Sequence, residues 1–163
     1  MATNGGISAI YSPLDIDQFT DSELAAAAFV TERFGSYFMV HAYYDNAVSR
    51  AIEFGARSIE HGHLMTEKVV RQMAREDVYL VVEALMSTSD APPSFTADQR
   101  EKFELAKSGF VEMIELAKKH KLKIAFGSDV FLSKEAYALQ SLEWVARSEL
   151  FSPVENLRQA TSI

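Results

Sequence analysis

The chain alternates amphipathic segments with short apolar runs, and capping signals mark where several of the segments begin. Thr20 and Glu23 form a capping box, and the alanine-rich segment from Asp21 to Phe34 stops at Gly35, which predicts a helix with both ends marked. Polar and apolar positions predict further helices at 46–54, 66–77, 96–120 and 136–149, and a last one opened by the capping box of Ser152, Pro153 and Glu155.

Apolar runs between these helices predict strands at 37–41, 57–61, 78–86 and 123–127. Strands that alternate with helices indicate a parallel sheet of right-handed βαβ units, with strands buried on both faces, so the predicted fold class is α/β. The segments from Ile7 to Phe19 and from Ser87 to Phe95 are longer than typical loops of such units. They suit lids over a site and, equally, plain surface loops.

Composition narrows the classes of partner. A chain of 163 residues, 48% of them hydrophobic, predicts one domain with its own core. The formal charge of -7 repels phosphate backbones and anionic lipids, so we expect no nucleic-acid partner. Apolar runs far shorter than the roughly 20 residues that span a bilayer predict no membrane partner and a soluble protein, cytoplasmic by default. The absence of cysteine excludes disulfides, thiolate zinc sites and cysteine nucleophiles.

Three predicted strands finish at a side chain that can bind a metal ion: His41, His61 and, just past its strand, Asp129. In parallel α/β folds the chemistry lies at the carboxyl ends of the strands, so these side chains are expected to share one site. Two imidazoles and one carboxylate suit zinc or a similar divalent ion with a position left for water. Sequence signatures of serine hydrolases, zincins, phosphate loops and dinucleotide sites are absent, so a metal-activated water is the chemistry best supported.

The motifs His-Ala-Tyr at 41–43, Ile-Glu-His-Gly at 59–62 and Phe-Gly-Ser-Asp at 126–129, in this order, resemble the amidohydrolase superfamily. The resemblance is to its branch of imidazolonepropionase-like and prolidase-like metal-dependent hydrolases. It implies a (β/α)8 TIM-type barrel with a small β-sandwich. It also implies that His41 and His61 are the metal ligands of barrel strands 5 and 6, and that Asp129 of strand 8 is both a ligand and the catalytic proton acceptor.

Other ligands of that family, a His-x-His pair from strand 1 and a lysine or glutamate from strand 4, have no counterpart in this chain. The opening "MATNGG" resembles the segment that follows the strand 4 lysine, except for the additional Asn4. The resemblance therefore implies that residues 1–163 form the C-terminal half of the barrel domain, about four βα units, without the N-terminal half and the β-sandwich. Half a barrel leaves strand edges open, and we expect two copies to associate as a homo-oligomer that closes it.

Three functions follow as alternatives. The resemblance implies hydrolysis of amide or other C–N bonds in a small-molecule substrate, such as a dipeptide, an N-acyl amino acid or a cyclic amide, with one or two divalent ions, zinc above all. The missing ligands point instead to a catalytically incompetent fragment or a half-barrel structural or interaction module. An unrelated α/β binding domain with chance histidines is the third.

Three residues near these motifs have more than one interpretation. His63 is interpreted as a loop residue near the site mouth or a substrate contact, or as the partner of His61 in a chelating pair that also uses His41 and Asp129. Tyr43 either faces the substrate or packs against the adjacent loop. Glu83 lies inside a predicted apolar strand, where a buried carboxylate needs a partner, and the sequence identifies none.

Overall fold

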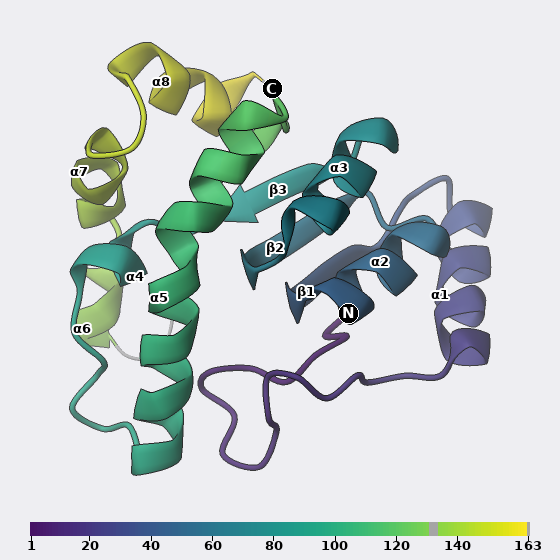
Figure 1. Ribbon diagram of the computed structural model, residues 1–163, viewed down its shortest axis with the longest axis horizontal. Helices are drawn as coiled ribbons and strands as arrows, with labels where there is room; N and C mark the ends of the chain where they lie inside the picture. Colours follow the sequence, from purple (N-terminus) through teal and green to yellow (C-terminus); the bar gives the residue numbers. More distant parts are fainter. Residues whose placement is uncertain (131–133, 163) are drawn as a thin grey trace.

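The computed structural model describes residues 1–130 and 134–162. Its centre is a four-stranded parallel sheet in the order β1-β2-β3-β4, with helices between the strands (Figure 1). The strands are β1 Met39–Tyr44, β2 Ser58–Leu64, β3 Tyr79–Val82 and β4 Ile124–Phe126. The helices are α1 Asp21–Arg33, α2 Asp45–Glu53, α3 Glu67–Arg75, α4 Leu85–Thr88, α5 Ala97–Lys119, α6 Lys134–Tyr137, α7 Leu142–Ser148 and α8 Pro153–Thr161.

The predicted helix starts are confirmed where the capping signal is local. Capping boxes with both reciprocal hydrogen bonds open α1 at Thr20, α5 at Thr96 and α8 at Ser152. Each box satisfies two backbone N–H groups that a helix start otherwise leaves without a partner. Within the described part of the chain, no helix is long and apolar enough to cross a lipid bilayer.

One face of the sheet carries the core and the other stays partly open. Alternate strand residues, such as Val40, Ile59 and Leu80, are fully buried in one hydrophobic cluster with residues of α2, α3 and α5. The neighbouring position Met39, on the opposite face, is 54% exposed. The expectation of strands buried on both faces is therefore met only in part. Positions of both faces are buried in most of β2, but β1, β3 and β4 have exposed or half-buried positions on the second face.

Two predicted elements differ from the structure near residue 83. The strand expected at 78–86 stops at Val82, and 85–88 form the short helix α4, because the Ala84 and Leu85 amides donate to the Glu143 carboxylate and turn the chain. The helix expected at 136–149 is divided into α6 and α7, with turns at 138–141 between them. The hydrogen bonds from the Ala84 and Leu85 amides hold Glu143, and with it α7, at the end of β3, so α7 forms a helix separate from α6.

The strands that carry the histidines are longer than predicted. Both were expected to end at a histidine, but β1 continues to Tyr44 and β2 to Leu64. A register shift between Ala42 and Tyr44 marks a bulge, after which Tyr44 pairs with Leu64. Such an irregularity bends a strand and re-aims its side chains, and here it lies beside the histidines.

The first residues of the chain extend the sheet past β1. Ala2 makes a parallel bridge with His41, and the Thr3 amide donates to the His41 carbonyl at 2.9 Å. The Met1 carbonyl accepts the His41 amide at 2.8 Å. Residues 1–3 therefore lie beside β1.

Gly109 is expected to be needed for the stability of the fold, because at this residue α5 packs directly on the backbone of β2. A Cβ atom built at Gly109 lies 2.4 Å from the His63 carbonyl oxygen and 2.8 Å from Leu64 Cδ2. Replacing Gly109 with alanine is expected to reduce the free energy of unfolding by about 1–3 kcal/mol, since overpacking outweighs the helix preference for alanine. Urea denaturation measures the change. Ser108→Ala, at an exposed position of the same helix, is the control, and equal stability of both variants contradicts the prediction.

Candidate metal-dependent hydrolase site

His41 lies on β1 with its ring at the carboxyl end of the sheet. Its Nε2 is 3.0 Å from the Gly5 carbonyl oxygen, which can only accept, so Nε2 carries the proton and Nδ1 keeps a free lone pair. Burial and the neighbouring His61 lower the pKa of His41 to about 4, despite opposing effects of the Gly5 carbonyl and Glu83. His41 is therefore a neutral imidazole with Nδ1 available as a metal ligand.

The turn after residue 3 sets the position of His41, and sequence analysis did not identify this role. Asn4 Oδ1 accepts the amides of Tyr43 and Tyr44 at 3.1 and 3.2 Å, which ties the turn to the end of β1. Only glycine fits at position 5 of this turn, because a Cβ atom there would clash with the Pro13 carbonyl oxygen at 2.1 Å. The additional Asn4 of "MATNGG" is thus a structural contact of β1.

His61 occupies an unusual backbone conformation in β2. Its φ of 74° and that of Gly62, 65°, are both left-handed, which for a residue other than glycine is a strained conformation typical of functional sites. The left-handed φ of 65° at residue 62 favours glycine, since any side chain there would be strained. The His61 and His41 rings meet edge to face, 4.6 Å apart between centroids.

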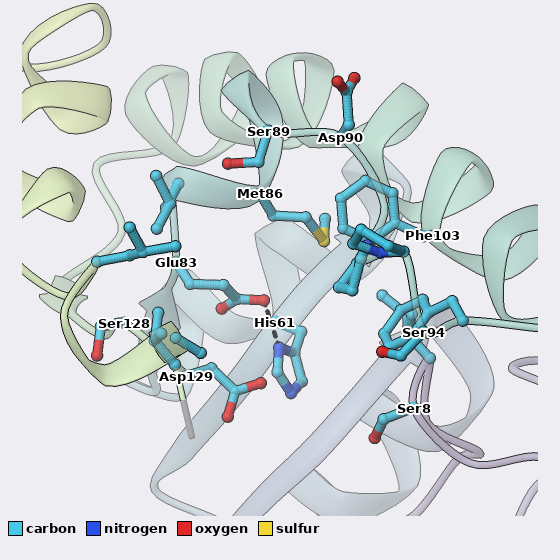
Figure 2. A pocket seen from close by; sticks show the side chains of 18 of the residues that line it. Ser8, His61, Glu83, Met86, Ser89, Asp90, Ser94, Phe103, Ser128 and Asp129 are labelled. Atoms are coloured by element: carbon cyan, nitrogen blue, oxygen red, sulfur yellow. Dashed lines mark hydrogen bonds and ion pairs between the residues drawn. The ribbon is translucent and has the colours of Figure 1, made fainter. Parts of the chain in front are cut away.

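Sequence analysis identified Glu83 as a buried carboxylate that needs a partner, without identifying that partner. In the structure two histidines lie against its carboxylate. Its Oε1 lies 2.5 Å from His61 Nδ1 (Figure 2). The same oxygen lies 3.2 Å from His63 Nε2. Burial raises the pKa of Glu83, but His61 and His63 together lower it by more than burial raises it. The net pKa of Glu83 is therefore well below its ordinary range. For His61 burial again opposes the charged form, and Glu83 raises the pKa above its ordinary value.

His63 does not lie in a loop near the site mouth, so that interpretation is wrong. It lies within β2, 1% exposed, behind the neighbouring His61, with its ring against Phe110 at 5.1 Å and Tyr43 at 5.6 Å. The left-handed residues 61 and 62 interrupt the regular alternation of β2, and the His61 and His63 rings lie 5.8 Å apart between centroids, both within reach of Glu83. The chelating-pair interpretation combined His61 and His63 with His41 and Asp129. In the structure the two histidines share Glu83, which the sequence did not identify as a member of that set.

Tyr43 lies in the middle of the histidines. Its ring stacks on His61 at 4.9 Å and 7°, and meets His41 edge to face at 5.2 Å. The side chain is 2% exposed, and burial, together with the Glu83 and Asp129 carboxylates, raises the pKa of its phenol well above the ordinary value. Tyr43 packs with Leu14 and Ile7 of the loop and also lines the cavity, so the two interpretations of Tyr43 are not exclusive.

Asp129 follows β4 and faces the same cavity. Its φ of 45° is left-handed, as at His61. Figure 2 shows its carboxylate beside the His61 ring, on the side away from Glu83. Partial burial raises the pKa of Asp129, with Glu83 acting in the same direction and His61 opposing it. The structure thus brings His41, His61 and Asp129 to one place at the carboxyl end of the sheet.

The cavity above these residues has a volume of about 710 Å³ and is lined by both long loops. Ile7 and Ser8 come from the first loop, and 89–90 and 92–95 from the second. The expected role of the loops as lids is consistent with this position. The floor is polar and the walls are largely apolar, with Leu85, Met86 and Phe103 among them (Figure 2). Its size is typical of small-molecule sites.

The donor atoms fit a divalent metal ion. His61, His63 and Glu83 each offer one ligand atom, and these atoms lie within 4.8 Å of one another. His41 adds a neutral Nδ1, and Asp129 adds a carboxylate. Imidazole nitrogen with carboxylate oxygen is a set that zinc and its neighbours in the first transition row prefer.

No protein-family model matches the chain, and no curated protein matches it. Solved structures do. A prolidase complexed with N-methylphosphonate-L-proline superimposes with a TM-score of 0.90 at 28% identity, covering 99% of this chain and 40% of that chain. An amidohydrolase superimposes with a TM-score of 0.87 at 27% identity, covering 98% of this chain and 39% of that chain. A Xaa-Pro dipeptidase with methionine bound in its active site superimposes with a TM-score of 0.84 at 25% identity, covering 98% of this chain and 40% of that chain.

These similarities agree with the site geometry and with the motifs. The chain spans about 40% of the length of these solved structures, so its α/β fold is a partial TIM-type barrel. The neighbours are enzymes that their names identify as prolidases and amidohydrolases. The chain is therefore related, over part of their length, to the prolidase-like enzymes of the amidohydrolase superfamily.

Proposed function

We propose that this chain takes part in metal-dependent hydrolysis of an amide or other C–N bond in a small molecule. One observation carries the proposal: His41 of β1, His61 of β2 and Asp129, which follows β4, meet at the floor of one cavity at the carboxyl end of the sheet. Chemistry at this end is the rule for barrels of this kind.

The hydrogen bonds decide which ring nitrogens would hold the ion. Gly5 accepts from Nε2 of His41, which leaves Nδ1, and Glu83 bonds Nδ1 of His61, which leaves Nε2. Partners of this kind fix the tautomer and the ring orientation of a ligating histidine. We propose His41 Nδ1, His61 Nε2 and Asp129 as the ligands, with zinc as the ion.

When bound, a divalent ion supplies a Lewis acid that lowers the pKa of water toward about 7 and polarises the scissile carbonyl. Asp129 is placed to accept the proton of the attacking water and to deliver it to the leaving nitrogen. Partial burial raises the pKa of this carboxyl, a shift in the direction that a proton acceptor and donor requires. Tyr43, buried against His61, holds that ring in position and presents its edge to the substrate.

The shape of the cavity supports a substrate with an apolar side chain next to the scissile bond. Its apolar walls are contributed by residues such as Leu85, Met86 and Phe95, and its volume suits a dipeptide or an N-acyl amino acid. The neighbouring prolidase and Xaa-Pro dipeptidase make dipeptides that end in proline the first substrates to test.

A substrate panel tests the proposal. The chain is freed of metal with a chelator, reloaded with Zn²⁺, Mn²⁺ or Co²⁺, and offered Xaa-Pro dipeptides, N-acetyl amino acids, a cyclic amide and a phosphoester. We expect ion-dependent release of amine from at least one C–N substrate, fastest with an apolar side chain. A folded, metal-loaded chain that hydrolyses none of them, or hydrolyses only the phosphoester, contradicts the proposal.

A further inference from the structure

His61, His63 and Glu83 form a compact group on the buried side of the site, here called the inner triad. The three residues are 6%, 1% and 8% exposed, and one ligand atom of each lies within 4.8 Å of the other two. The set differs from the proposed catalytic ligands in two of its three members. Only His61 belongs to both.

His63 has a buried imidazole ring, and among the residues that the structure describes neither of its nitrogens has a hydrogen-bond partner. Its Nε2 lies 3.2 Å from Glu83 Oε1 without the geometry of a hydrogen bond. Buried polar atoms in native proteins are nearly always satisfied, so an orphaned imidazole aimed at a carboxylate indicates an absent partner.

The ring of His63 is also fixed in place. Phe110 meets it edge to face at 5.1 Å, and Tyr43 and His61 do so at 5.6 and 5.8 Å. A ring packed against three others keeps its orientation without a hydrogen bond. His63 is therefore preorganised to hold a ligand between itself and Glu83.

We propose that the inner triad binds one divalent transition-metal ion, zinc being the best match, through His61 Nδ1, His63 Nε2 and a Glu83 oxygen. Two imidazoles and one glutamate form a known type of zinc ligand set. Bonds of 2.0–2.1 Å at tetrahedral angles place ligand atoms about 3.3 Å apart. The His63–Glu83 separation of 3.2 Å already suits this, and the His61–Glu83 pair at 2.5 Å has to open by about 1 Å.

The inner triad and the proposed catalytic position use opposite nitrogens of one ring. Figure 2 shows Glu83 on the Nδ1 side of His61, and the Asp129 carboxylate away from it. A neutral imidazole has one lone pair, so an ion at Nδ1 puts the proton on Nε2 and removes that nitrogen as a ligand. The inner triad is thus an alternative position for the ion, and its occupation competes with the catalytic one.

The Asp129→Asn background isolates the inner triad, because it weakens the catalytic position and leaves the three inner residues untouched. In this background we expect one Zn²⁺ per chain by equilibrium dialysis. Adding His63→Gln is expected to raise the Kd at least about tenfold, since even partners of metal ligands contribute 10–100-fold. Adding His120→Gln is the matched control: His120 Nε2 pairs with Glu67 Oε1 at 2.8 Å, away from the site, and its loss is expected to change nothing.

A second measurement leaves His63 in place and so does not depend on the folding of a variant. Zn²⁺ added to the ¹⁵N-labelled Asp129→Asn chain is expected to shift the Nε2 resonance of His63 strongly, and that of His120 little. An unchanged His63 resonance, or an equal Zn²⁺ affinity with and without His63→Gln, overturns the inner triad. Neither result bears on hydrolysis, which the substrate panel tests separately with the unmodified chain.

Discussion

Replacing Arg147 with alanine is expected to lower the free energy of unfolding by about 3–5 kcal/mol, the usual cost of removing one partner from a buried ion pair. Arg147 and Glu143 of α7 are both 0% exposed, with Nη1 and Oε1 3.4 Å apart. Burial raises the pKa of Glu143 and lowers that of Arg147, while the pairing opposes both shifts. Without the guanidinium, a buried carboxylate loses its counter-charge.

The loss is large because Arg147 joins three parts of the fold. Its guanidinium donates to the Val82 carbonyl of β3 at 2.9 Å and to Asn156 Oδ1 of α8 at 3.2 Å. The same group lies over the rings of Phe126 and Phe151, 4.9 and 5.0 Å from their centroids. Such contacts with aromatic faces strengthen when they are shielded from water.

Urea denaturation followed by circular dichroism measures the effect. Arg158→Ala, at an exposed position of α8, is the control and is expected to change the free energy of unfolding by less than about 0.5 kcal/mol. The double variant Glu143→Gln with Arg147→Met is expected to be less destabilised than Arg147→Ala, because it leaves no uncompensated charge. A loss below about 1 kcal/mol in Arg147→Ala means that the pair does not stabilise the fold as we infer.

The same ion pair positions the candidate site from behind. Arg147 binds the Val82 carbonyl, and Glu143 accepts the amides of Ala84 and Leu85 at 2.6 and 2.7 Å. The backbone on both sides of Glu83 is therefore fixed, and the Glu83 carboxylate is directed at His61. Residues about 60 positions further along the chain thus determine where a site residue points.

Local signals predicted much of the fold. The capping boxes at Thr20, Thr96 and Ser152 involve residues three apart, so they can be recognised without knowledge of the tertiary structure. The alternation of helices and apolar runs similarly predicted the four parallel strands of the sheet, although not their order in it. Strand ends were less accurate, since the bulge that extends β1 and β2 depends on pairing between strands.

Tertiary contacts determined what the sequence did not reveal about the site. His41, His61 and Asp129 were identifiable because each follows an apolar run, and the carboxyl ends of parallel strands meet. The partners of Glu83 were not, since an apolar strand pattern shows which face a residue occupies but not which side chain of another strand it meets. The left-handed backbone at His61 and Asp129 has no signal in the sequence either.

Replacing Asp129 with asparagine is expected to reduce kcat for the C–N substrate identified in the panel by about 10²- to 10⁴-fold, the usual contribution of a positioned acid–base group. The amide keeps the size of the side chain, but it cannot accept a proton from water or deliver one to the leaving nitrogen. It is also a weaker metal ligand than a carboxylate, and the inner triad competes for the ion. Both proteins are therefore compared in a His63→Gln background at saturating Zn²⁺, which separates the loss of proton transfer from the loss of metal.

Asp90→Asn is the matched control, because Asp90 lines the same cavity at the second loop, away from His61 (Figure 2). It is expected to leave kcat within about twofold of the original chain, since it touches none of the proposed ligands and surface changes of this kind are usually small. Equal kcat values for Asp129→Asn and the unmodified chain would show that Asp129 transfers no proton. In that case a different group accepts the proton of the attacking water, with Glu83, the other carboxylate beside His61, the first to test.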